Sequence, residues 1–256
     1  GTGNQQELQN WLDTLGGGIA EDACSDVTWS VDFPGLTDDC GATGFGTATF
    51  TATDDCGNSV SENANFIIID TAAPTIDVEA APMTVECDGD GNQAQFAAWL
   101  TDNGGAEASD ICSGNNIVWS NNADDQDFTD DCGETGEMEV IFTTTDDCGN
   151  SADTKAIFKI EDTTPPTIDT PAEDATVECD GAGNDAQLQA WLNANGNAAS
   201  SDDCSTVTWT NNYTSLSDDC GATGSATVTF TATDDCGNNT STTAQFIIQD
   251  TTDPVF

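Results

Sequence analysis

Two cysteine-containing motifs recur three times along the chain, and this repetition limits the possible folds more than any other feature. Asp-Asp-Cys-Gly-x-Thr-Gly begins at residues 38, 130 and 218, and Thr-Asp-Asp-Cys-Gly-Asn begins at residues 53, 145 and 233. Such self-similarity indicates a tandem array in which each repeat is one small unit. The sequence therefore predicts modules at residues 1–73, 74–165 and 166–253, with residues 254–256 beginning a fourth.

The joints between modules are expected to be short and of fixed length. Cys56 and Cys87 are 31 residues apart, and so are Cys148 and Cys179. Proline occurs at each joint, whereas a flexible tether would be rich in Gly and Ser and would tolerate changes of length. The first module is expected to be truncated, because it lacks a counterpart of residues 84–87.

The apolar pattern within a module predicts mainly β-structure with one helix. Residues 226–233 alternate apolar residues with Thr, and residues 244–248 form a second strand after a tight turn, so the two make a hairpin. Leu188, Trp191 and Leu192 instead follow helical spacing, as do their counterparts in the other modules. The predicted fold class is all-β: tandem immunoglobulin-like β-sandwich modules, each with one short inserted α-helix and two disulfides.

Four cysteines in each complete module allow three disulfide connectivities. A zinc site is disfavoured because neighbouring cysteines lie at least 16 residues apart, whereas zinc-binding pairs are separated by two to four residues. In an immunoglobulin-like sandwich the cysteines lie at two poles, and we expect those at one pole of a module to pair. The predicted pairs are Cys24–Cys56, Cys87–Cys132, Cys112–Cys148, Cys179–Cys220 and Cys204–Cys236, with Cys40 unpaired because of the truncation.

The charge of the chain excludes several classes of function. There are 47 Asp and Glu residues against 2 Lys and no Arg or His, a formal net charge of -45. Two cations cannot form the basic patch that nucleic acid requires, and no histidine is present to act as a general base. The acidic residues recur on turns of small modules, which do not form one deep cleft. We therefore predict no enzyme activity, no nucleic-acid binding and no direct membrane insertion.

The acidic residues nevertheless suggest a metal site at the joints. An Asp ends the last strand of each module, and the next module brings a paired Asp-Asp turn to the same joint. Converging carboxylates repel one another unless a cation lies between them, and Ca²⁺ prefers oxygen ligands. The alternative is that these residues cap turns and form solvated surface. The predicted interdomain Ca²⁺ ligands are Asp70, Asp146, Asp147, Asp162, Asp234, Asp235 and Asp250.

Weaker motifs suggest sites of glycosylation. Two Asn-x-Thr sequons match the N-linked acceptor pattern, and an Asp-Thr-small tripeptide at each module end is similar to an O-glycan acceptor used in Bacteroidota. The candidate acceptors are Asn212, Asn238, Thr71, Thr163 and Thr251.

The segment Thr229–Pro254, echoed at Thr49–Pro74 and Ile141–Pro165, resembles the hyaline-repeat (HYR) family. It is most similar to the four-cysteine HYR-like modules of giant surface adhesins in Bacteroidota, such as gliding-motility adhesins. The resemblance implies immunoglobulin-like extracellular modules in long arrays, often exported by the type IX secretion system. The helix with its Trp and the paired Asp-Asp-Cys motifs depart from simpler hyaline repeats.

Repeats, disulfides and acidic joints together predict a structural role outside the cell. We expect a repeat segment of a long cell-surface adhesin or filament, acting as a rigid stalk stiffened by Ca²⁺. The alternatives are modules that bind a glycan or surface ligand, and a subunit of a self-assembling multi-chain fibre. The expected partners are neighbouring modules of the same chain and, for the fibre, identical chains.

Overall fold

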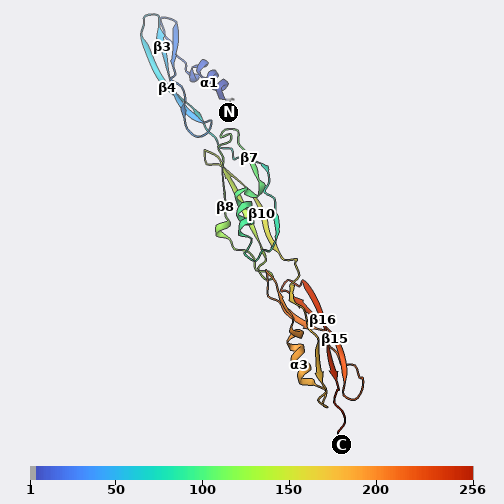
Figure 1. The fold of residues 1–256 in the computed structure, drawn as a ribbon. Helices are drawn as coiled ribbons and strands as arrows, with labels where there is room; N and C mark the ends of the chain where they lie inside the picture. Colours follow the sequence, from blue (N-terminus) through green and yellow to red (C-terminus); the bar gives the residue numbers. More distant parts are fainter. Residues whose placement is uncertain (1–3, 256) are drawn as a thin grey trace. The chain divides into compact units, whose positions relative to one another are not determined.

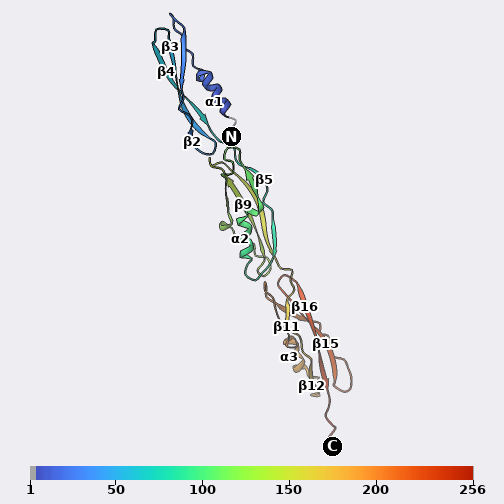
Figure 2. The ribbon, with the colours of Figure 1, turned by 45° about the horizontal axis from the view of Figure 1, so that its top comes forward.

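The computed structural model describes residues 4–255 (Figures 1 and 2). These residues divide into two compact units. Within the described residues, the first unit contains residues 4–81, 99–125 and 140–156, and the second contains residues 82–98, 126–139 and 157–255. Each unit therefore holds one outer repeat and part of the second repeat. The module boundaries expected from the sequence stay a prediction.

The third repeat, in the second unit, is built on a four-stranded sheet in the order β12-β16-β15-β14. β15 and β16 form an antiparallel hairpin in which Val228 lies opposite Ala244. β12 runs parallel to β16, whereas β14 runs antiparallel to β15. A second sheet pairs β11 with β13. The bounds are β11 Thr167–Thr170, β12 Ala175–Glu178, α3 Asp185–Asn193, η4 Asn195–Asn197, β13 Ala199–Ser201, β14 Thr208–Asn211, β15 Gly224–Thr233 and β16 Asn239–Gln249.

The core of the third repeat lies between this sheet and α3, which is drawn beside β15 and β16 in Figure 1. Phe230 and Phe246 are buried on the inner face of the hairpin, and the Trp191 ring meets the Phe230 ring edge-on. Edge-on aromatic pairs add about 0.5–1.5 kcal/mol beyond the burial of their surface. The Trp191 indole N–H also donates to the Glu173 carbonyl at 3.0 Å, so the helix is fixed both by packing and by a hydrogen bond.

The second repeat has the same order of elements, with a sheet β6-β10-β9-β8 and a small sheet β5-β7. β6 runs parallel to β10, as β12 does to β16. The bounds are β5 Thr75–Val78, β6 Met83–Glu86, α2 Gln93–Thr101, η2 Asn103–Gly105, β7 Glu107–Ser109, β8 Val118–Asn121, η3 Ala123–Asp125, β9 Gly136–Thr145 and β10 Ser151–Glu161.

The first repeat, in the first unit, has fewer strands. β3 pairs with β1, β2 and β4, and among residues 4–255 β4 pairs only with β3. In the other repeats the corresponding edge is covered by β6 or β12. Ile67 and Ile69 lie near this edge and are largely exposed. The bounds are α1 Asn4–Asp13, η1 Leu15–Gly17, β1 Val27–Asp32, β2 Thr37–Asp38, β3 Gly44–Asp54 and β4 Ser59–Ile68.

The predicted all-β, immunoglobulin-like sandwich class is confirmed, with one short α-helix in each repeat. The alternation in residues 226–233 buries Val228, Phe230 and Ala232 completely, and helical spacing places Leu188, Trp191 and Leu192 in the core. Local periodicity was therefore sufficient to predict the β15–β16 hairpin and α3.

The predicted disulfide pairs are wrong. The structure contains Cys40–Cys148, Cys87–Cys204 and Cys132–Cys236, which join residues 104 to 117 positions apart. Cys40, predicted to be unpaired, is bonded. The cysteines that carry no disulfide within the described residues are Cys24, Cys56, Cys112, Cys179 and Cys220. None of the predicted pairs is therefore present in the described part of the chain: Cys24–Cys56, Cys87–Cys132, Cys112–Cys148, Cys179–Cys220 and Cys204–Cys236.

The physical reason is that neighbouring repeats bring their cysteine turns together. The amide of Ala42 donates to the carbonyl of Cys112, and the amide of Glu134 donates to that of Cys204, both at 2.8 Å. These hydrogen bonds join a turn of one repeat to a loop of the next. Each thiol therefore meets a partner across the joint, and the disulfides link repeats instead of closing within one.

Candidate functional site

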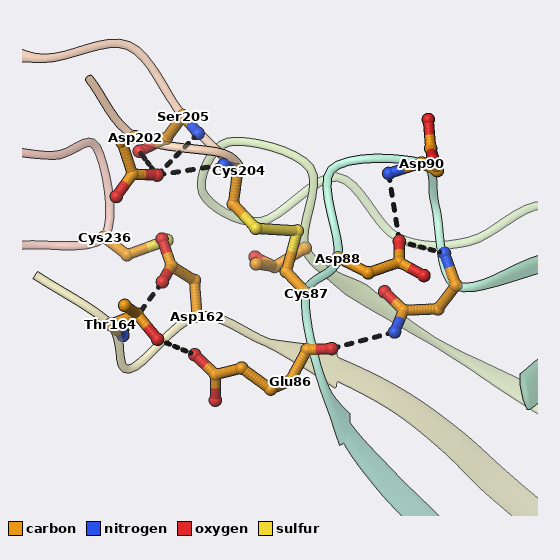
Figure 3. The surroundings of a disulfide bond; sticks show 12 residues. Glu86, Cys87, Asp88, Asp90, Asp162, Thr164, Asp202, Cys204, Ser205 and Cys236 are labelled. Carbon is orange, nitrogen blue, oxygen red and sulfur yellow. Dashed lines mark hydrogen bonds between the residues drawn. A yellow bond between two sulfur atoms is a disulfide. The ribbon is translucent and has the colours of Figure 1, made fainter. Parts of the chain in front are cut away.

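The joint between the second and third repeats lies within the second unit and brings Asp162 and Asp202 together beside the Cys87–Cys204 disulfide (Figure 3). Asp202 lies in the loop before β14, where its Oδ1 accepts the amides of Cys204 at 2.9 Å and Ser205 at 3.0 Å. This Asx turn fixes the loop and directs the carboxylate toward the joint. Ligand atoms of Asp162, Asp202 and Cys204 all lie within 4.8 Å of one another.

Asp162 follows β10 and is 8% exposed. Its Oδ1 accepts the amide of Thr164 at 3.1 Å, whereas its Oδ2 is buried and has no hydrogen-bond partner among residues 4–255. An unsatisfied buried carboxylate oxygen is costly, because it has lost water and gained no replacement. Such an atom is suited to a ligand that supplies positive charge.

Asp234 adds a second atom of this kind. It lies in the turn after β15, is 5% exposed, and its Oδ1 accepts the amide of Asn238 at 2.8 Å. Its Oδ2 is buried without a hydrogen-bond partner in the described part of the chain. The Asn238 side-chain amide donates to the Asp162 carbonyl at 3.0 Å, which holds this turn of the third repeat against the end of the second.

Burial raises the pKa of Asp162 above its usual value, and the negative charges of Asp202, Asp234 and Glu86 raise it further. Glu86, at the end of β6, behaves in the opposite way. The amide of Thr163 and the hydroxyl of Thr164 donate to its carboxylate, and these bonds lower its pKa. At this joint the carboxylate of Glu86 is satisfied by hydrogen bonds, whereas the negative charge of Asp162 is poorly compensated.

A cavity of about 90 Å³ lies beside these groups. Its lining includes Asp162, Thr164, Asp202, Asp203 and the Cys87–Cys204 disulfide. This volume is sufficient for a cation with a few waters, because a water molecule occupies about 30 Å³ of liquid. The cavity is too small for an organic ligand of drug size.

The joint between the first and second repeats, in the first unit, repeats the arrangement. Ligand atoms of Asp70, Asp110 and Cys112 lie within 4.8 Å of one another, and Asp70 Oδ2 is buried without a hydrogen-bond partner among the described residues. Asp110 Oδ1 accepts the amide of Cys112 at 2.8 Å. The Asn150 side-chain amide bonds both the Asp70 carbonyl, at 3.4 Å, and Asp146 Oδ2, at 2.8 Å.

These groups fit a hard divalent cation. The available ligands are carboxylate oxygens, which Ca²⁺ prefers, and the remaining positions of its six to eight ligands are open to water and backbone carbonyls. A soft-metal site is a poorer fit, because the sulfur of Cys204 is bonded to that of Cys87 and the chain has no histidine. The orphaned oxygens Asp162 Oδ2 and Asp234 Oδ2 are the observations that carry this fit.

The structure brings some of the predicted ligands together and leaves others apart. Asp162 lies near Asp234, and Asp70 is linked to Asp146 through Asn150. The carboxylate of Asp235 instead accepts the hydroxyl of Thr206 at 2.8 Å. Asp147 is exposed, and so is Asp250, whose carboxylate accepts the amide of Thr252.

The sequence analysis missed Asp110 and Asp202. Each lies two positions before a cysteine, and Asp22 lies in the same position before Cys24. This repeated Asp-x-Cys spacing was the signal available in the sequence.

The candidate acceptors of glycans differ in their surroundings. The hydroxyls of Thr163 and Thr251 donate to Glu86 and Glu178, both at 2.9 Å, whereas Thr71 is exposed. Asn212 is exposed, and its side-chain oxygen accepts the amide of Thr229 at 2.8 Å. The side-chain amide of Asn238 donates to the Asp162 carbonyl at the joint. Glycosylation at these positions stays a prediction.

Comparisons with known proteins give matches only among solved structures. No protein-family model matches the chain, and no curated protein matches it. Drosophila N-cadherin EC1-4 is 10% identical over 90% of this chain and 68% of its own, with a TM-score of 0.31. Mouse cadherin-23 EC22-24 is 12% identical over 88% of this chain and 86% of its own, with a TM-score of 0.28.

A third similar structure is PcdhgB3 EC1-4, 13% identical over 82% of this chain, with a TM-score of 0.29. The chain spans 58% of the length of that protein. Within residues 4–255, no helix is long and apolar enough to cross a membrane.

Proposed function

We propose that the chain is a structural repeat segment of an extracellular adhesion-type surface protein, with joints stiffened by disulfides and by a bound divalent cation, Ca²⁺ in the first instance. The observation that carries the proposal is the pair of buried, unpartnered carboxylate oxygens at the joint, Asp162 Oδ2 and Asp234 Oδ2. The resemblance to HYR-like modules of Bacteroidota adhesins suggests the same role and compartment.

Covalent joints suit a segment that bears load. A linker of a few residues leaves two modules free to rotate, whereas the disulfides Cys87–Cys204 and Cys132–Cys236 tie two separate points of one repeat to the next. Each closes a loop of about 100 residues, which stabilises the linked state by about 4.7 kcal/mol in the chain-entropy model. Disulfides of this kind persist in an oxidising extracellular environment.

The cation would complete the joint by neutralising the carboxylates. Asp162 and Asp202, which line the cavity, would supply its protein oxygens, the nearby negative charge of Asp234 would favour it, and water would fill the remaining positions. Binding only to the folded joint would stabilise it by about 2.7 kcal/mol when the cation is at 100 times its dissociation constant.

The test compares two aspartates that occupy equivalent positions. Asp162→Asn removes a ligand from the joint, whereas Asp250→Asn changes the exposed counterpart after β16. We expect Ca²⁺ to raise the Tm of the wild type and of Asp250→Asn, measured against EDTA at matched ionic strength. The rise should be smaller by at least half in Asp162→Asn, and calorimetry should lose one binding event. Equal Tm values with Ca²⁺ and EDTA in the wild type would refute the cation site.

A further inference from the structure

The joint between the second and third repeats holds two sulfur atoms that take no part in the proposed cation site. The sulfur of Cys204 lies within 4.8 Å of ligand atoms of Asp162 and Asp202, and the sulfur of Cys87 is bonded to it. Figure 3 shows this disulfide beside the two carboxylates. All four residues line the same cavity of about 90 Å³. Two sulfurs and two carboxylates therefore gather at one place inside the second unit.

This set of four side chains matches a different metal once the disulfide is reduced. Zn²⁺ in proteins is bound almost always by four ligands in a tetrahedron, drawn from Cys thiolates, His nitrogens and Asp or Glu carboxylates. Because cysteine binds a metal as the thiolate, the disulfide keeps both sulfurs from serving as ligands. Reduction of this one bond supplies two soft ligands beside two hard ones.

We propose that the reduced joint binds Zn²⁺ through the thiolates of Cys87 and Cys204 and the carboxylates of Asp162 and Asp202. The proposal rests on the proposed function for the role of the joint, but it does not require Ca²⁺ to bind the oxidised chain. It gives one joint two metal-binding states, a hard-cation site when oxidised and a zinc site when reduced.

A zinc ion fits this set after small movements. With Zn–O and Zn–S bonds of about 2.0–2.3 Å, neighbouring ligand atoms of a tetrahedral site lie about 3.4–3.8 Å apart. The atoms of Asp162, Asp202 and Cys204 lie within 4.8 Å of one another, so they need to approach by roughly 1 Å. Rotation of the side chains about their own bonds is sufficient for this movement, and the cavity leaves space for the ion.

Asp162 points to a ligand independently of the cysteines. Its side chain is 8% exposed, and its Oδ2 is buried without a hydrogen-bond partner among residues 4–255. A thiol formed by reduction is only a weak hydrogen-bond donor, so it satisfies this oxygen poorly. A bound Zn²⁺ would give Asp162 Oδ2 a strong partner and would offset the negative charge of the carboxylate.

Hydrogen bonds that do not involve the disulfide hold these side chains at the joint. The amide of Cys87 donates to the Glu161 carbonyl at 2.8 Å, and the amide of Cys204 donates to Asp202 Oδ1 at 2.9 Å. Across the joint, the amide of Glu134 donates to the Cys204 carbonyl at 2.8 Å. Reduction therefore leaves two thiols facing two carboxylates, with the backbone around each thiol already fixed.

Reduction and zinc binding balance as two steps. One thiolate of a dithiol such as dithiothreitol attacks the disulfide, forms a mixed disulfide with one cysteine and releases the other. The second thiolate of the reductant then closes its own ring and releases the first cysteine. Two electrons and two protons pass to Cys87 and Cys204, and the dithiol becomes a cyclic disulfide. Zn²⁺ then displaces both protons, because it binds the thiolates.

The reduced state also precedes the oxidised one in every newly made chain, because disulfides form over seconds to hours. Cys87 and Cys204 are 117 positions apart in the sequence. A zinc ion held by both cysteines and by both aspartates would bring the two sulfurs together before they bond.

The experiment measures how fast each cysteine of the whole chain is alkylated. Cysteines without a disulfide are first blocked with iodoacetamide, the three disulfides are reduced with dithiothreitol, and the reductant is removed without oxygen. Zn²⁺, Ca²⁺ or EDTA is then added, and maleimide labelling is followed by mass spectrometry. We expect Zn²⁺ to slow labelling of Cys87 and Cys204 at least tenfold relative to EDTA. Ca²⁺ should not slow it, and Cys40 and Cys148 should keep their rates.

Matched variants identify the ligands. Asp162→Asn/Asp202→Asn keeps every thiol and should weaken zinc binding at least tenfold, whereas Asp250→Asn changes an exposed aspartate and should leave it unchanged. Urea unfolding of the oxidised chains checks that each variant folds. Co²⁺ in place of Zn²⁺ should give the wild type a thiolate-to-metal charge-transfer band, which Cys87→Ser/Cys204→Ser should lack.

Three results would overturn the proposal. The first is no zinc protection of Cys87 and Cys204 in the wild type. The second is equal zinc affinity in Asp162→Asn/Asp202→Asn, because the carboxylates would then not be ligands. The third is equal protection of all six reduced cysteines, which would mean unspecific binding to thiols. Because these samples are reduced and the Ca²⁺ test uses the oxidised chain, either proposal can fail alone.

Discussion

The contact between Gly133 and the next repeat gives a prediction that can be tested against a matched control. Gly133 and Gly221 occupy the same position in their turns, with φ +57° and φ +64°. Replacing either by Ala places a side chain in a left-handed conformation, at a cost of about 1–2 kcal/mol. Because this cost is shared, the difference between the two variants isolates the contact across the joint.

That difference can be worked out from the structure. A Cβ on Gly133 would meet the Cys204 carbonyl oxygen at 2.5 Å and the Ser205 Cβ at 2.6 Å, whereas a Cβ on Gly221 would meet nothing within 4 Å. Relieving such overpacking costs about 1–3 kcal/mol. Moving the turn away also weakens the 2.8 Å bond from the Glu134 amide to Cys204, worth about 1 kcal/mol. The joint should therefore open more easily by about 2 kcal/mol or more.

The rate of reduction of Cys132–Cys236 reports this opening. The free thiols are first alkylated, so that they cannot exchange with the disulfides, and a low concentration of dithiothreitol is then added. Maleimide trapping and mass spectrometry follow each cysteine with time. We expect Gly133→Ala to accelerate reduction about 30-fold, which corresponds to 2 kcal/mol, and Gly221→Ala to stay within threefold of the wild type. Equal rates in the two variants would refute the docking of this turn on the next repeat.

Two further predictions concern ionisation and the core. The pKa of Asp162 in the folded state is raised above 3.8, so folding favours the protonated carboxyl. The contribution of Asp162 to the stability of the protein is therefore complete below the unfolded-state pKa, and it is lost as the pH rises through the folded-state pKa. Urea unfolding in EDTA measures the free energy of unfolding of Asp162→Asn and of the wild type at two pH values. The variant should therefore gain more stability over the wild type at about pH 7 than at about pH 3. The same gain at both pH values would contradict the raised pKa of Asp162. In the core, Trp191→Phe removes the 3.0 Å hydrogen bond from the indole N–H to the Glu173 carbonyl. Beyond the loss of ring surface, this should lower the free energy of unfolding by about 1 kcal/mol. The comparison is with the loss of stability in Trp11→Phe, at the equivalent position of α1.

The elements of the fold could be predicted because they depend on local pattern. Val228 and Phe230 alternate with Thr along one strand, and the structure buries both completely. Leu188 and Trp191 repeat at helical spacing, and they form the buried face of α3. In each case the burial of one face is fixed by residues within about ten positions, so no knowledge of distant contacts is needed.

The disulfides could not be predicted in the same way, because they depend on contacts between residues more than 100 positions apart. If each cysteine paired within its own module, Cys132 would bond Cys87. In the structure Cys132 instead bonds Cys236, and Cys87 bonds Cys204. The choice of partner depends on how two repeats dock, and no spacing within one repeat records that.

Only part of the candidate metal site could be predicted, again because the site depends on how two repeats dock. Asp162 and Asp234 stand at ends of strands, where the module pattern brings them to a joint. Asp202 lies in a loop whose conformation is fixed by its own Asx turn, and a turn-forming Asp gives no sign in the sequence that it lies close to an Asp of the preceding repeat. Asp235 was predicted beside Asp234, yet its carboxylate is held by Thr206. Two adjacent residues in a turn point in different directions, which the sequence does not resolve.

Covalent closure and cation binding have different roles at such a joint, and their magnitudes suggest the order in which they act. Carboxylates of Asp162 and Asp202 within 4.8 Å repel by about 3 kcal/mol at the effective dielectric constant of about 20 that suits protein sites. The Cys87–Cys204 disulfide, closing a loop of about 100 residues, contributes about 4.7 kcal/mol in the opposite direction. One disulfide is therefore sufficient to hold the loops together against the repulsion before any cation arrives. The proposed cation would then find a preformed site, so the disulfides would determine which repeats are joined and the cation how stiff the joint is.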